Sequence, residues 1–138
     1  MTAFVGAKLA LFAGPELVVI ERDDIPTIDW PGFLDFPGGG REGCESPVAC
    51  ALRETHEELG LKVPETELVW QRLYPHPLGQ VWFFAAHLEA RVAQDIRFGD
   101  EGLGWRLMTP AAYMAHPRAT PQFRSRLQDY LRESGRTP

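Results

Sequence analysis

The order of the predicted elements constrains the fold more than any other feature of this chain. One helix is signalled at both ends, because Ser46 is a typical N-cap residue, Pro47 suits the first helical turn and Gly60 provides a left-handed stop. This helix, over residues 47–59, lies between apolar runs that are typical of strands. Strands mixed with separated helices predict an α/β protein in which helices cover the faces of a sheet.

Turn residues and apolar runs give the remaining boundaries. Strands are predicted at residues 5–12, 17–20, 33–36, 67–74, 80–88 and 104–108. Gly14 and Pro15 separate the first two strands as a hairpin, and the glycines at 38–40 are interpreted as the turn that leads into the helix. Further helices are predicted from Pro110 and over 121–132. No repeat or linker interrupts the pattern, so residues 1–138 are expected to form a single domain.

Charge and cysteine content exclude several functional classes. A net charge of −5 offers no basic field for a polyanion, so no stable nucleic-acid binding is expected. The apolar run ending at Ala13 is too short to span a membrane and has no basic start, so no membrane association is expected. Cys44 and Cys50 form no Cys-x-x-Cys pattern, which favours a reducing cytoplasm. The expected assembly is a monomer or a homodimer.

The predicted helix has two contrasting sides when its residues are placed at about 100° each. One stripe is expected to pack on the core: Val48, Leu52, Thr55 and Leu59. The opposite side carries three carboxylates: Glu54, Glu57 and Glu58. Neighbouring carboxylates repel by a few tenths of a kcal/mol per pair, and the helix C-terminus disfavours them further. A hard divalent cation removes this conflict, whereas an ordinary solvated acidic surface is the alternative for three glutamates alone.

The segment from Gly39 to Leu61 resembles the Nudix box, G-x5-E-x7-R-E-U-x-E-E-x-G-U, in which U is a bulky aliphatic residue. All seven fixed positions are matched: Gly39, Glu45, Arg53, Glu54, Glu57, Glu58 and Gly60. Seven matches by chance have a probability on the order of 10⁻⁸ to 10⁻⁹ per starting point. Leu61 satisfies the final U, but Thr55 replaces the first, so a slightly poorer contact between helix and core is expected there.

The resemblance implies a Nudix-type α/β/α sandwich with a mixed β-sheet between helices. It also implies hydrolysis of the pyrophosphate linkage in a nucleoside diphosphate linked to another moiety, with Mg²⁺ or Mn²⁺ bridging enzyme and pyrophosphate. The partner is then a small nucleotide-type substrate. A nucleoside triphosphate is favoured, because the chain lacks the extra N-terminal domain with which many ADP-ribose enzymes dimerise.

By the same resemblance, four residues are expected to bind metal: Gly38 through its carbonyl, Glu54, Glu57 and Glu58. Glu54 has an alternative role, which is to orient the attacking water. Arg53 is expected mainly to hold a ligand carboxylate, with direct phosphate contact as the alternative. For Glu45 three interpretations are open: a metal ligand, a partner of Arg53, or an ordinary glutamate favoured by the dipole near a helix N-terminus. Many family members have a further catalytic glutamate on a later loop. Glu101 is the candidate here, Asp100 competes with it, and an ordinary acidic turn is the other interpretation.

Other functions remain open. An ADP-ribose or nucleotide-sugar pyrophosphatase is one alternative, although His76 stands where ADP-ribose enzymes have a proline. A non-catalytic nucleotide-binding module is another, and the complete set of box carboxylates argues against it. Isomerisation of a prenyl diphosphate needs a catalytic cysteine, for which Cys44 is poorly suited. Candidates for stacking on a nucleobase are Trp30, Phe36, Tyr74, Trp82 and Phe83, although aromatic residues in strands usually belong to the core.

Overall fold

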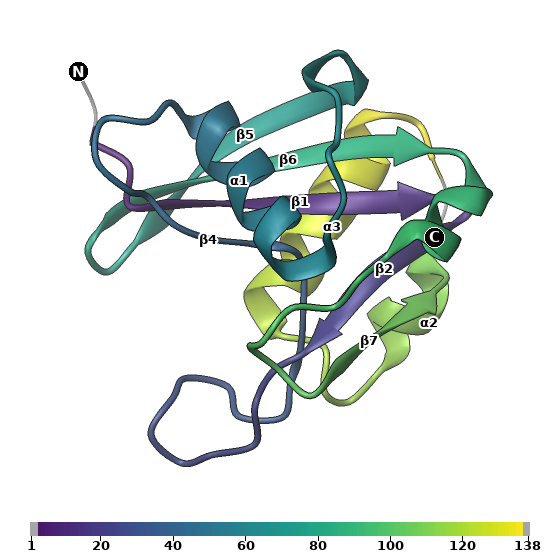
Figure 1. Ribbon diagram of the computed structural model, residues 1–138, viewed down its shortest axis with the longest axis horizontal. Helices are drawn as coiled ribbons and strands as arrows, with labels where there is room; N and C mark the ends of the chain where they lie inside the picture. The colour runs from purple at the N-terminus through teal and green to yellow at the C-terminus, as the bar shows by residue number, and fades with distance from the viewer. Residues whose placement is uncertain (1–2, 137–138) are drawn as a thin grey trace.

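A single mixed sheet with helices on both faces organises the computed structural model, which describes residues 3–136 (Figure 1). The strands are Gly6–Ala13 (β1), Glu16–Glu21 (β2), Leu34–Asp35 (β3), Gly38–Gly40 (β4), Leu68–His76 (β5), Gly79–Leu88 (β6) and Gly104–Met108 (β7). The α-helices are Pro47–Leu59 (α1), Pro110–Ala115 (α2) and Pro121–Glu133 (α3). Short 3-10 helices lie at Glu65–Glu67 and Ala90–Asp95.

The strand β1 lies at the centre of the sheet, whose main order is β3-β2-β1-β6-β5. β1 is parallel to β6 and antiparallel to β2 and β4, and β7 extends the sheet beyond β2. The start of β1 is flanked on both sides, because Gly6 pairs with Gly40 of β4 and with Val81 of β6. This arrangement confirms the predicted mixed sheet between helices.

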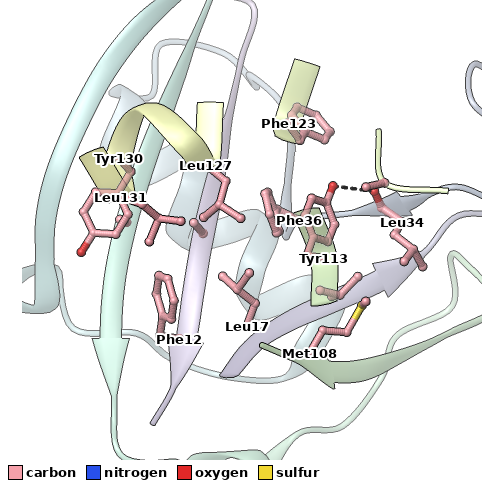
Figure 2. Packing of buried hydrophobic residues seen from close by; sticks show 14 of the residues in the cluster. Phe12, Leu17, Leu34, Phe36, Met108, Tyr113, Phe123, Leu127, Tyr130 and Leu131 are labelled. Atoms are coloured by element: carbon pink, nitrogen blue, oxygen red, sulfur yellow. Dashed lines mark hydrogen bonds between the residues drawn. The ribbon is translucent and has the colours of Figure 1, made fainter. Parts of the chain in front are cut away.

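Residues of β1 alternate between two cores, as expected for a strand covered on both faces. Ala10 and Phe12 pack with α2 and α3, whereas Leu9 and Leu11 pack with α1. Figure 2 shows the first of these cores, in which the hydroxyl of Tyr113 donates a 3.0 Å hydrogen bond to the Leu34 carbonyl. The cores fix α1 on one face of the sheet and α3 on the other (Figure 1).

The boundaries of α1 agree with the prediction, but its buried face differs. The Ser46 hydroxyl accepts a 3.1 Å hydrogen bond from the Ala49 amide, and Gly60 ends the helix with a φ of 69°. The fully buried residues of α1 are Cys50, Ala51, Thr55 and Leu59. Val48 and Leu52 are only partly buried, so the packing stripe is rotated towards the smaller residues. The Thr55 hydroxyl donates to the Ala51 carbonyl at 2.7 Å, which satisfies this polar group inside the core.

The glycines at 38–40 form strand β4, where the sequence predicted only a turn. Their pairing with β1 is close, because a Cβ on Gly6 would lie 2.6 Å from the Gly39 carbonyl oxygen. Glycine is therefore required at position 6 for β4 to approach. The helix Ala90–Asp95 was also not predicted. Within residues 3–136, none of the helices has the length and apolar character needed to cross a bilayer.

Candidate active site

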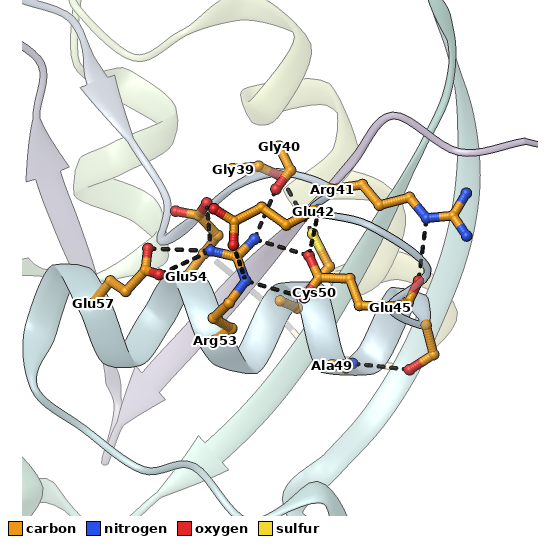
Figure 3. A network of polar contacts seen from close by, with 12 residues as sticks. Gly39, Gly40, Arg41, Glu42, Glu45, Ala49, Cys50, Arg53, Glu54 and Glu57 are labelled. Atoms are coloured by element: carbon orange, nitrogen blue, oxygen red, sulfur yellow. Dashed lines mark hydrogen bonds and ion pairs between the residues drawn. The ribbon is translucent and has the colours of Figure 1, made fainter.

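Arg53 connects the acidic face of α1 to the loop that precedes the helix (Figure 3). Its guanidinium donates to both oxygens of Glu45, at 2.8 and 3.0 Å, and to the Gly40 carbonyl at 2.8 Å. It also binds Glu54 at 3.1 Å and Glu57 at 3.0 Å. The hydrogen bonds from Arg53 are the main reason why the pKa of Glu45 falls to about 2. In this structure Glu45 is thus a partner of Arg53, and Arg53 holds two of the box carboxylates.

Two carboxylates of the acidic face, Glu54 and Glu58, lie against β4. The Gly38 amide donates a 2.7 Å hydrogen bond to Oε1 of Glu58. A Cβ on Gly39 would come within 2.6–2.8 Å of the Glu54 carboxylate, so the absence of a side chain there makes room for it. The Gly38 carbonyl, an expected metal ligand, accepts a 3.2 Å hydrogen bond from Lys8. Two successive glycines of β4 therefore face two carboxylates of α1.

Burial makes these carboxylates costly to ionise. Desolvation is the main cause that raises the pKa of Glu58 to about 7, against the opposing effects of Lys8 and the Gly38 amide. Desolvation also raises the pKa of Glu54. A bound divalent cation would compensate this cost, and a set of carboxylate oxygens suits hard Mg²⁺ or Mn²⁺. Within residues 3–136 no three His, Cys, Asp or Glu side chains are already arranged around one metal position. Arg53 engages two of the carboxylates instead.

Glu101 lies on the lining of a small cavity that also contains Glu58. This cavity has a volume of about 150 Å³ and is also lined by Arg22 and Asp35. Asp100, the competing candidate, is not among the residues that line this cavity. The tertiary structure therefore brings Glu101 of the loop before β7 towards the end of α1.

A buried ion-pair cluster that sequence reasoning did not identify lies beside this cavity. Asp35, whose side chain is only 6% exposed, pairs with Lys8 and with Arg22, each at 3.0 Å. Its other oxygen accepts a 2.7 Å hydrogen bond from the Phe36 amide. The available sequence signals were a lysine inside an apolar strand and an aspartate between Leu34 and Phe36, because such charges need partners.

A larger cleft of about 560 Å³ extends from β4 across the face of the sheet that carries α3. Gly39 and Gly40 line it together with the start of β1, the β5–β6 turn and the first turns of α3. Trp30 also lines the cleft, is 39% exposed and has a φ of 51°. Among the aromatic candidates, Phe36 and Phe83 are fully buried in the core and are thus unavailable for stacking on a ligand.

Comparison with known proteins agrees with this architecture. A family model described as the NUDIX domain matches residues 4–130. The human mitochondrial coenzyme A diphosphatase NUDT8 is 45% identical over 62 residues, which are 44% of this chain. The matched part spans only about a quarter of that relative, 26% of its length.

Solved structures share the fold at low identity. The MutT protein from Methanosarcina mazei has a TM-score of 0.75 at 17% identity, with 96% of each chain covered. An Ap4A hydrolase from C. elegans has a TM-score of 0.73 at 18% identity, covering 94% of this chain and 98% of that one. The Nudix hydrolase RenU from M. smegmatis has a TM-score of 0.69 at 19% identity, covering 98% and 88%.

Proposed function

The chain belongs to the NUDIX domain family, and on that premise we propose that it is a metal-dependent pyrophosphohydrolase. Its substrate is a nucleoside diphosphate linked to another moiety. The observation that carries the proposal is the convergence of Glu54 and Glu58 on Gly38 and Gly39 of β4. Desolvated carboxylates gathered at a glycine backbone suit a cation and a phosphate chain better than they suit an ordinary solvated surface.

Glu54, Glu57 and Glu58 would hold the Mg²⁺ or Mn²⁺, with the Gly38 carbonyl as a further ligand. The ion supplies Lewis-acid chemistry, since it increases the acidity of water and neutralises charge that develops on phosphoryl oxygens. Arg53 positions Glu54 and Glu57 through its hydrogen bonds, so its proposed role is to orient ligands and not to contact substrate.

Two residues of the smaller cavity are proposed to act on the reacting groups. Glu101 faces the same space as Glu58 and is proposed to accept a proton from the attacking water. Arg22 lines both the cavity and the cleft, and its ion pair with Asp35 holds the guanidinium in place. It is therefore suited to donate hydrogen bonds to a phosphoryl oxygen.

The sequence favours a nucleoside triphosphate as the substrate. A second candidate is a nucleoside diphosphate joined to a long group, as in coenzyme A. It is favoured by the 45% identity to a coenzyme A diphosphatase over 62 residues. Cytoplasmic location, and assembly as a monomer or homodimer, stay predictions from the sequence.

The proposal is tested with a panel of nucleotides in Mg²⁺ or Mn²⁺. The panel contains nucleoside triphosphates, coenzyme A, dinucleoside polyphosphates, ADP-ribose and a nucleotide sugar. Hydrolysis in ¹⁸O-labelled water should place the label on a phosphate product, as expected for attack at phosphorus. A protein that binds a nucleotide but hydrolyses no member of the panel would be the non-catalytic module.

A further inference from the structure

Arg126 of α3 lines the large cleft without a carboxylate partner. Among residues 3–136, no side chain or carbonyl forms a hydrogen bond or an ion pair with its guanidinium. The group lies near two aromatic rings, with Cζ 4.7 Å from the Tyr74 ring centroid and 5.7 Å from that of Phe123. The other arginine of the cleft, Arg22, is paired with Asp35.

Asp129, whose charge acts on Arg126, is engaged by other residues. Asp129 accepts a 2.8 Å hydrogen bond from the Tyr74 hydroxyl and a 2.7 Å bond from Arg132. Arg126 is half-buried, and desolvation lowers its pKa, although an arginine stays charged under all ordinary conditions. A partly desolvated charge without a counterion is unfavourable until an anion binds it. The guanidinium is therefore available to a ligand in the cleft.

Phe123 links Arg126 to the proposed reaction site. Its ring lies 5.6 Å from Nζ of Lys8 and 5.7 Å from Cζ of Arg126. Nζ of Lys8 in turn donates to the Gly38 carbonyl at 3.2 Å. Arg126 and the glycines of β4 are thus parts of the same cleft, separated by one aromatic side chain and one lysine.

We propose that Arg126 is a specificity-determining residue that binds a second phosphate group of the substrate, remote from the scissile linkage. This inference rests on the proposed function, which places the scissile diphosphate at β4. A substrate bound there has room to extend along the cleft towards α3. The planar guanidinium, packed beside aromatic rings and without a carboxylate partner, has parallel N–H groups that match the oxygens of a phosphate.

The second phosphate has two possible sources in a nucleotide outside the scissile diphosphate: the ribose 3′ position and the ribose 2′ position. Two ligands separate them: adenosine 3′,5′-bisphosphate and adenosine 2′,5′-bisphosphate. Neither contains a linkage that the enzyme is expected to hydrolyse. Calorimetric titration in Mg²⁺ compares each of them with AMP, for the parent protein and for Arg126→Gln.

We expect the parent to bind at least one of the two bisphosphates about tenfold more tightly than AMP, as for one charge-assisted contact. Arg126→Gln should lose this preference while its affinity for AMP is unchanged. The matched control is Arg91→Gln, because Arg91 is exposed and pairs only with Glu89. Arg126→Met keeps the apolar stem against Tyr74 and replaces the first variant if that one does not fold.

Equal affinity of the parent for AMP and both bisphosphates would overturn the inference, as would a preference that survives in both Arg126 variants. A merely structural role predicts a lower melting temperature with equal changes for every ligand, which also overturns it. The test does not depend on turnover. A parent that prefers a bisphosphate but hydrolyses nothing on the panel would support Arg126 and contradict the proposed function. Hydrolysis without such a preference would support the proposed function and contradict the role of Arg126.

Discussion

The backbone amide of Gly38 donates a 2.7 Å hydrogen bond to Oε1 of Glu58, which attaches the last turn of α1 to strand β4. The next residue of the strand, Gly39, faces the carboxylate of Glu54. The acidic side of α1 therefore packs against strand β4, and desolvation raises the pKa of both carboxylates. An ordinary solvated acidic surface would not show this burial, so the contact favours a metal and phosphate site.

Removing divalent metal is expected to abolish hydrolysis, because the carboxylates of α1 repel an anionic phosphate when no cation lies between them. Millimolar Mg²⁺ or Mn²⁺ should also raise the melting temperature. A ligand that binds only the folded state at about a hundredfold excess over its Kd adds about 2.7 kcal/mol of stability. Assays with and without EDTA, and melts with and without metal, check both parts. Full turnover in excess EDTA would contradict this prediction.

Glu57→Gln should reduce turnover about a hundredfold or more, because the variant loses a proposed metal ligand. Its metal-free stability should change by less than about 0.5 kcal/mol, since the lost pair with Arg53 is exposed and repulsion from neighbouring carboxylates is relieved. Kinetics on the best substrate and metal-free unfolding measure the two effects. Glu65→Gln, at an exposed position, is the control. Turnover within a few-fold of the parent would exclude Glu57 as a ligand.

Glu58→Gln should change the pH dependence of metal-free stability. The folded pKa of Glu58, about 7, lies above the ordinary value of 4.5, so the folded state binds the proton more tightly. Protonation of Glu58 therefore contributes fully to the stability of the parent below pH 4.5, and this contribution is lost as the pH rises through 7. The glutamine side chain of the variant cannot ionise. At alkaline pH the free energy of unfolding of the variant should therefore exceed that of the parent by about 2–3 kcal/mol. Urea unfolding in EDTA at acidic and alkaline pH measures the difference, and an unchanged slope would refute it.

Gly39→Ala should disturb the site while leaving the fold intact. A Cβ at this position would displace the Glu54 carboxylate, which is the flexible end of a side chain. Displacing a ligand by about 1 Å costs roughly a hundredfold in rate, and the metal-induced rise in melting temperature should shrink. Gly40→Ala is the matched control on the same strand, because its nearest neighbour would be 3.9 Å away. Equal behaviour of the two variants would show that Gly39 makes no room for Glu54.

Asp35→Asn should destabilise the protein strongly, because it leaves Lys8 and Arg22 without their shared carboxylate. Removing one partner of a buried pair costs about 3–5 kcal/mol, and the partial exposure of the two cations reduces this to about 2–4 kcal/mol. Chemical unfolding of the variant measures the cost. Asp24→Asn, at an exposed position, should change stability little. A loss below about 1 kcal/mol for Asp35→Asn would mean that water already screens the cluster.

The local parts of the site were predictable from the sequence. The caps Ser46 and Gly60 and the bounds of α1 agree with the structure. These features depend on residues within a few positions of one another, for which the helical period and the capping rules suffice. The packing stripe of α1 is the exception. Which of its side chains are buried depends on the surface of the sheet that they pack against.

The sequence by itself determined the bounds of α1 and the order of the box residues along it. Only the tertiary structure decided what surrounds these residues. Strand β4 exists through pairing with β1, Asp35 meets Lys8 across 27 positions of sequence, and Glu101 of the loop before β7 lines the same cavity as Glu58. The unpartnered Arg126 is visible only once α3 lies over the cleft. These relationships follow from the order and register of the strands, which bring distant residues together, and no local pattern in the sequence encodes those distances.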